Sequence, residues 1–80
     1  MIEKLLRLPE VESLTGYKRS TIYLRVSAGL FPRQIRLGAR AVAWSGSEIA
    51  AMNAARIRGA SDEEIRALVH DLEAARKRAA

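Results

Sequence analysis

The segment LPEVESLTGYKRSTIYLRVSAGLFP, residues 8–32, decides the fold. Its first part predicts a short helix that starts at Pro9, because proline suits the first helical position, and that stops at Gly16. A second helix is expected from about Arg19 to Ala28, where Gly29 fits the C-terminal cap and a proline soon follows. Two short helices joined by a tight, glycine-containing turn indicate a helix-turn-helix unit.

Both helices carry apolar side chains at helical spacing. The residues expected to face the core are Leu8, Val11 and Leu14 in the first helix and Ile22, Tyr23 and Val26 in the second. The preceding run from Leu5 to Leu8 is expected to be extended, because a residue before proline disfavours helical angles.

After the second helix the apolar period changes to that of a strand. Residues 34–37 and 40–44 alternate loosely between polar and apolar, with Gly38-Ala39 between them, which predicts a hairpin. Its apolar residues are Ile35, Leu37, Val42 and Trp44, and we expect Trp44 to pack in the core. Arg33, Arg36 and Arg40 are expected on the outer face and tip. A basic hairpin after a helix-turn-helix has the character of a wing.

The remainder of the chain is predicted to be helical. Ser45 and Glu48 fit a capping box for a helix that runs to about Arg58, and Ser61 and Glu64 fit a second one. The inward residues are expected to be Ile49, Met52 and Ile57 in the first of these helices and Ile65, Leu68, Val69 and Leu72 in the second. The predicted class is α+β and mostly helical: a small winged helix-turn-helix over residues 1–58, with a C-terminal helix in 59–80 that packs on the domain or mediates self-association.

Composition limits the classes of function. The chain has 80 residues, so a deep catalytic cleft is not expected, and it has no cysteine for a disulfide or a thiolate metal site. No signal peptide or membrane-spanning run is visible, which makes a cytoplasmic protein without a membrane partner the expectation. The net charge is +5, and residues 13–47 contain six Lys or Arg and no acidic residue. Such a stretch suits a polyanion, although a solvated face explains it equally well.

An ordered series of short motifs resembles the AlpA family of prophage-type transcriptional regulators, relatives of the MerR-like and excisionase winged helix-turn-helix proteins. The motifs are Leu8-Pro9-Glu10-Val11, Thr15-Gly16, Arg19-Ser20-Thr21-Ile22-Tyr23, Gly29-Leu30-Phe31-Pro32 and Leu37-Gly38-Ala39-Arg40-Ala41-Val42-Ala43-Trp44. The resemblance covers about residues 5–58, and residues 61–78 look like the extra helix of part of the family. It implies binding of double-stranded DNA near promoters of phages or integrative elements, by a transcriptional regulator or an excisionase-like architectural factor.

The resemblance maps the recognition helix onto residues 19–28 and the wing onto residues 33–44. The expected DNA-binding residues are Lys18, Arg19, Ser20, Thr21, Arg25, Arg33, Arg36 and Arg40. Arg19 would read a base edge, Lys18 would contact phosphate, and the wing arginines would contact minor groove or backbone. Alternatives stay open: Ser20 as a helix cap, Arg25 as a solvated flank, and Arg33 as a cover for the hairpin base. Lys18 also departs from the Ser or Thr of many relatives at the cap position, which weakens the cap by about 1 kcal/mol.

No catalytic, cofactor-binding or metal-binding residue is predicted, and the chain is not expected to be an enzyme. The only histidine, His70, lies off the apolar stripe and is interpreted as a solvated surface residue. A second hypothesis is a protein-interaction module that uses Ile65, Leu68, Val69 and Leu72 on a partner or another copy. A homodimer or cooperative self-association on DNA also stays open.

Overall fold

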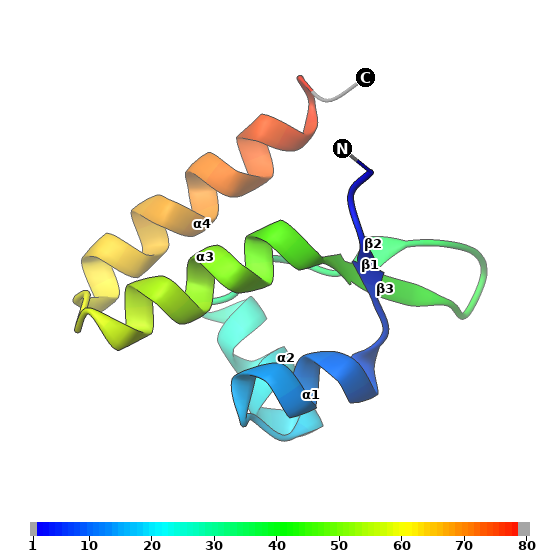
Figure 1. Cartoon of the computed structure of the whole chain (residues 1–80), viewed down its shortest axis with the longest axis horizontal. Helices are drawn as coiled ribbons and strands as arrows, with labels where there is room; N and C mark the ends of the chain where they lie inside the picture. Colours follow the sequence, from blue (N-terminus) through cyan, green and yellow to red (C-terminus); the bar gives the residue numbers. More distant parts are fainter. Residues whose placement is uncertain (1, 79–80) are drawn as a thin grey trace.

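The structure, a computed structural model, describes residues 2–78 and has the predicted α+β class (Figure 1). Within these residues, four helices accompany one three-stranded sheet. The elements in chain order are β1 (Leu5–Leu6), α1 (Leu8–Thr15), α2 (Arg19–Ser27), β2 (Ile35–Arg36), β3 (Val42–Ser45), α3 (Gly46–Ile57) and α4 (Asp62–Arg76). Helices α3 and α4 lie side by side, while α1 and α2 form a separate layer and the β2–β3 hairpin extends away from the helices (Figure 1).

The helix-turn-helix forms with small differences from the prediction. Helix α1 begins at Leu8, one residue before the expected start, and ends as predicted at Gly16, whose φ of 77° is left-handed. Val11 is fully buried, but Leu14 is 55% exposed, so the expectation that Leu14 faces the core was wrong. The backbone of the last turn of α1 is held by α3, because the Asn53 amide donates to the Leu14 carbonyl oxygen at 3.0 Å, while the Leu14 side chain faces solvent.

The sheet has one more strand than the predicted hairpin. β1 pairs with β3 through Leu6 and Trp44, and β2 pairs with β3 through Arg36 and Val42, all antiparallel. The apolar residues of the hairpin therefore do not share a face. Arg36 lies opposite Val42 on the face of Trp44, while Ile35 lies on the other face, because directly paired residues project to the same side.

The turn of the hairpin is longer than Gly38-Ala39. The backbone N–H groups of Leu37 and Gly38 both donate to the carbonyl oxygen of Ala41, at 2.8 and 3.3 Å, which leaves residues 37–41 as a loop. Leu37 is consequently 46% exposed and does not anchor the wing, contrary to the prediction.

Trp44 is the centre of the core, as predicted. It is fully buried, its indole N–H donates to the carbonyl oxygen of Pro32 at 2.9 Å, and its ring meets Phe31 and Tyr23 edge-on. Trp44 therefore joins the wing to the segment that follows α2. The buried cluster around it contains Leu6, Val11, Ile22, Phe31, Ile49, Met52, Ala55, Ile65 and Val69.

Helix α3 corrects two expectations. Ile57 is 86% exposed, because it lies five residues, or about 140° of helix, from the buried Met52. The Ser45 hydroxyl accepts from the Glu48 N–H as predicted, but the Glu48 carboxylate does not complete the capping box. It binds the Arg76 guanidinium instead, at 2.6 and 2.8 Å, since a charge-assisted pair is stronger than the cap bond.

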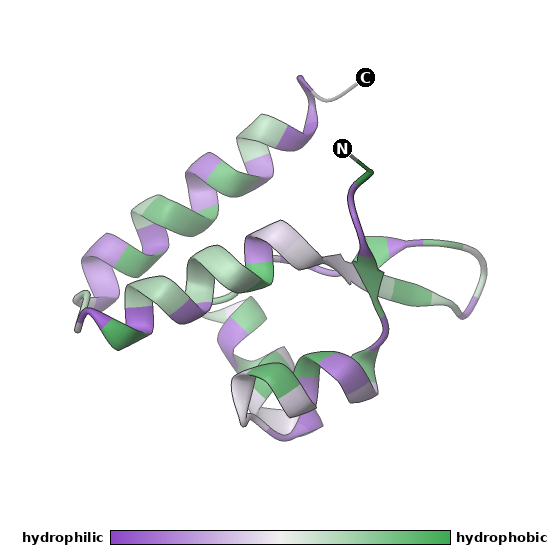
Figure 2. Ribbon diagram, in the orientation of Figure 1, coloured by the Kyte–Doolittle hydropathy of each residue, from purple (hydrophilic) through white to green (hydrophobic). Residues whose placement is uncertain are grey.

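Helix α4 starts at the predicted capping box, in which Ser61 and Glu64 exchange both bonds. Ile65 and Val69 are buried in the core, and Leu68 and Leu72 pack against it. Figure 2 shows the corresponding alternation of apolar and polar bands along α4. Among the described residues, no helix is both long enough and apolar enough to cross a membrane.

Candidate nucleic-acid interface

The exposed side of α2 is polar and basic with one exception. Arg19 and Ser20 are exposed in the first turn, and Ser27 is exposed in the last. Between them lies Leu24, which is 69% exposed. Ile22 on the opposite face is fully buried, so α2 is held by one side and presents the other to solvent.

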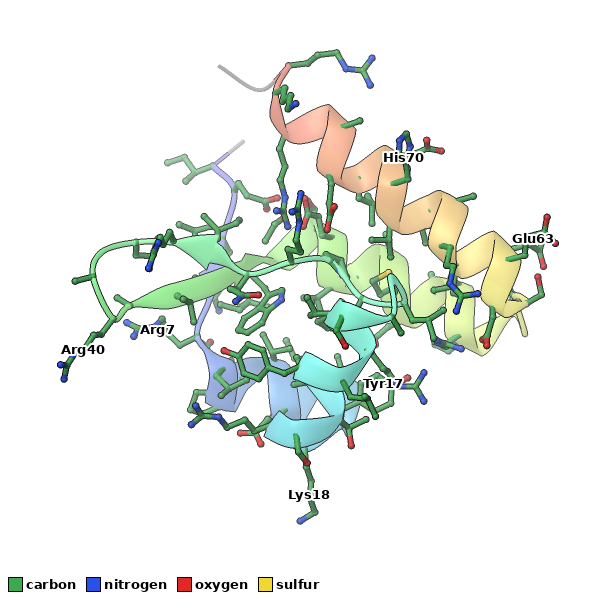
Figure 3. All side chains as sticks on the ribbon, turned by 180° about the vertical axis from the view of Figure 1, so that it is seen from behind. Arg7, Tyr17, Lys18, Arg40, Glu63 and His70 are labelled. Atoms are coloured by element: carbon green, nitrogen blue, oxygen red, sulfur yellow. The ribbon has the colours of Figure 1, made fainter. Side chains whose placement is uncertain are left out.

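The N-terminus of α2 is capped by a residue of α1. Lys18 occupies the cap position with extended backbone angles and makes no side-chain cap bond. The Glu12 carboxylate accepts the N–H of Arg19 at 2.9 Å and so replaces the missing cap. Ser20 lies within the first turn and is not the cap. Lys18 is left free, and its side chain points away from the body of the protein (Figure 3).

Three arginines from three different elements line one shallow depression. Arg7 is the residue before α1, Arg19 is the first residue of α2, and Arg40 lies at the tip of the wing. Tyr23 and Val42 contribute to its floor, together with Leu8 and Pro9. The Arg19 guanidinium carbon is 5.8 Å from the centre of the Tyr23 ring. Arg7 and Arg40 lie near the same edge of the molecule, with Arg40 projecting outward (Figure 3). The depression joins α2 and the wing into one basic surface.

Two of the predicted DNA-binding residues contact other side chains of the protein and do not line this depression. The Arg25 guanidinium carbon lies 4.8 Å from the centre of the Tyr17 ring, and Arg25 is half-buried. Arg33 lies at the base of the wing, where both its backbone N–H and its guanidinium contact Glu73, at 2.8 and 3.4 Å. Arg25 and Arg33 therefore have partners within the fold, and the paired Arg33 side chain is still 72% exposed.

The remaining predicted residues stay at the surface. Arg36 and Arg40 are exposed, as are Lys18, Arg19 and Ser20, while Thr21 is half-buried. Within residues 2–78, no carboxylate forms an ion pair with the four cations of this group or with Arg7. These cations make this surface of the described fold basic, and the nearby Glu12 and Glu10 carboxylates accept backbone N–H groups of Arg19 and Arg7.

Sequence reasoning missed three residues of this region. Arg7 lies outside the acid-free stretch, among Glu3, Glu10 and Glu12, so local charge gave no signal for it. Leu24 is an apolar residue that lies outside the apolar stripe of α2, and this position in the sequence already indicated an exposed apolar side chain. The role of Glu12 depends on the angle between α1 and α2, which local sequence does not reveal.

The histidine and the acidic side chains of residues 2–78 are of the types that bind metal ions. His70 is exposed and lies 3.6 Å from Asp71. Among residues 2–78, no group of three or more His, Cys, Asp or Glu side chains could hold a metal ion.

Comparisons with known proteins identify the family of this chain. The family model described as prophage CP4-57 regulatory protein (AlpA) matches residues 4–57. The "Uncharacterized protein ORF88" of Enterobacteria phage P4 is 51% identical over 57 residues, which is 71% of this chain and 65% of the relative. The match thus spans somewhat less than two thirds of that relative's length. No solved structure matches the chain.

Proposed function

This chain belongs to the AlpA family of prophage regulatory proteins, and from that premise we propose that it is a sequence-specific, double-stranded-DNA-binding transcriptional regulator of a phage or integrative element. In this proposal it acts in the cytoplasm and has no catalytic role.

In the proposed complex, α2 enters the major groove with Arg19 and Ser20 at base edges. Lys18 contacts a phosphate beside the start of the helix, and Arg40 and Arg36 reach the adjacent backbone or minor groove. Arg7 would hold the phosphates between these two regions. Arg25 is assigned to the fold because it is half-buried and lies 4.8 Å from the Tyr17 ring centre, whereas Arg19 is exposed and lies 5.8 Å from that of Tyr23. Arg33 is assigned to the fold because Glu73 pairs with it.

The convergence of Arg7, Arg19 and Arg40 carries the proposal. These three arginines come from separate elements, line the same depression and have no carboxylate partner in residues 2–78, so an anion placed along the depression would be attracted by all three. A phosphate backbone supplies that anion along a line that runs from the major groove to the neighbouring minor groove.

The experiment compares two neighbouring cations. Duplexes are selected from a random-sequence pool, and binding of the best one is measured beside binding of an unrelated duplex. Arg19→Ala should weaken the selected site by about 1–3 kcal/mol and reduce the preference for it, because a base contact is lost. Lys18→Ala should weaken both duplexes alike. Equal losses on both duplexes for both variants would remove Arg19 from base reading, and no selection of any duplex would end the proposal.

We also propose that residues 59–80 stabilise the domain and do not mediate self-association. The burial of Ile65 and Val69 supports this, because the centre of the apolar stripe of α4 is covered by the chain itself, with Leu68 and Leu72 half-buried beside it. Sedimentation across protein concentrations tests it. A monomer at every concentration is expected, and a concentration-dependent dimer would favour the interaction module.

A further inference from the structure

The exposed side chain of Leu24 has no role in the fold. It lies near the middle of α2, is 69% exposed and is absent from the apolar cluster and from the residues packed against it. We propose that Leu24 reads the C5-methyl group of a thymine in the major groove. This inference rests on the proposed function and adds a chemical specificity to it.

The surroundings of Leu24 favour this occupant. Ser20 and Ser27 lie one turn before and after it, and both are exposed. The Ser27 hydroxyl donates to the Leu24 carbonyl oxygen at 2.8 Å, which fixes the serine along the helix. Unpaired Lys18 and Arg19 precede this row. An isolated apolar side chain among hydroxyls and cations lacks the contiguous patch that a protein partner requires.

The major groove matches that pattern. Its base edges offer hydrogen-bond donors and acceptors, its walls are phosphates, and its apolar feature is the thymine methyl group. Hydroxyls and cations thus meet polar and anionic groups, and Leu24 meets the methyl group. If α2 lies along the groove, the four steps from Ser20 to Leu24, which share a face of the helix, rise about 6 Å, or just under two base pairs. The thymine should therefore lie about two base pairs from the base that Ser20 contacts.

The experiment removes the methyl group without changing the protein. In the selected duplex, each thymine in turn is replaced by deoxyuridine, and the Kd of the wild-type protein is measured by fluorescence anisotropy. At one or two adjacent positions we expect binding to weaken about fourfold, which corresponds to one buried methyl group. Leu24→Ala should weaken binding to the thymine duplex by a similar factor and should bind the thymine and deoxyuridine duplexes equally.

The matched control is Ile57→Ala. Ile57 is also an exposed aliphatic residue on a helix, at 86% exposure, but it lies at the end of α3. This variant should keep both the wild-type affinity and the sensitivity to deoxyuridine. If wild-type binding is selective but no deoxyuridine substitution weakens it, the inference is wrong and the proposed function stands. If Leu24→Ala keeps the wild-type sensitivity, another side chain reads the methyl group and the inference is equally wrong.

Discussion

The two sides of the molecule use arginine differently. On the side of α3 and α4, Arg76 binds the buried Glu48, Arg66 donates to the Ala28 carbonyl oxygen at 3.1 Å, and Arg33 is paired with Glu73. On the side of α2 and the wing, Arg19 and Arg40 are exposed without a carboxylate partner in residues 2–78. The partnered arginines and the exposed arginines carry the same charge, so charge alone does not distinguish them.

The partners of these arginines make the difference. Arg66 holds the C-terminal end of α2, and Arg76 donates to the Arg33 carbonyl oxygen at 2.8 Å at the base of the wing. Helix α4 thus fixes the two elements that carry the unpaired cations. The partnered arginines hold α2 and the wing in place, while Arg19 and Arg40 stay exposed at their surface. Arg58 and Arg78, on the side of α3 and α4, are exposed as well but lie outside the depression that Arg19 and Arg40 line.

The largest expected loss of stability follows the removal of Trp44, the core residue that joins the wing to the segment after α2. Trp44→Ala should reduce the free energy of unfolding by about 3–5 kcal/mol, because it removes a fully buried aromatic ring and leaves a cavity. Thermal unfolding followed by circular dichroism measures the loss. A stable variant with normal DNA affinity would show that the wing does not depend on this anchor.

Breaking the ion pair behind the interface should have an intermediate effect. Arg76→Met leaves Glu48, whose side chain is 8% exposed, without its cation, and should cost about 1–3 kcal/mol of stability. The pKa of Arg76 is raised, chiefly by its hydrogen bonds to Glu48, in keeping with a favourable pair. Urea unfolding measures the change, with Arg78→Met, exposed near the same end, as the control. Equal stability of the two variants would mean that the pair contributes nothing.

The smallest expected change in stability is the pH-dependent contribution of Glu3 in the N-terminal segment. Hydrogen bonds from the Ser45 hydroxyl and then the Ser47 hydroxyl lower the pKa of Glu3 below its usual 4.5. The carboxylate therefore stabilises the fold above pH 4.5, and this contribution is lost as the pH falls through the lower folded-state pKa. The stability difference between wild type and Glu3→Gln should be constant near neutrality and shrink in acid. A difference that does not change with pH would exclude this contact.

Local signals predicted the parts of the fold that depend on neighbouring residues. The capping box at Ser61 and the glycine stop at Gly16 were foreseen because their partners lie within a few residues. The Glu48 carboxylate was assigned wrongly, because its partner Arg76 lies 28 residues away. The exposure of Ile57 was missed for a different reason: an apolar residue type does not fix which face of a helix it occupies.

In the candidate site, too, local sequence predicted the exposed cations but not the contacts between residues far apart in the chain. The exposure of Lys18, Arg19 and Arg40 agrees with a basic stretch that contains no acid. The pairing of Arg33 was not predictable, because Glu73 lies 40 residues further along the chain. Arg7 was also missed, since only the packing of α1 against α2 and the wing brings it to Arg19 and Arg40.

The most direct test of the account is the salt dependence of DNA binding by two arginine variants of the wing segment. The unpaired cations Lys18, Arg19, Arg36, Arg40 and Arg7 limit the wild-type slope of log K against log salt to about −4.5. Arg40→Ala should make this slope shallower by about 1, because one phosphate contact is lost, and Arg33→Ala should leave it unchanged, because Glu73 already neutralises that charge. The opposite order, or equal changes in both variants, would contradict the claim that cations without a partner in the fold, and not paired ones, contact the phosphates.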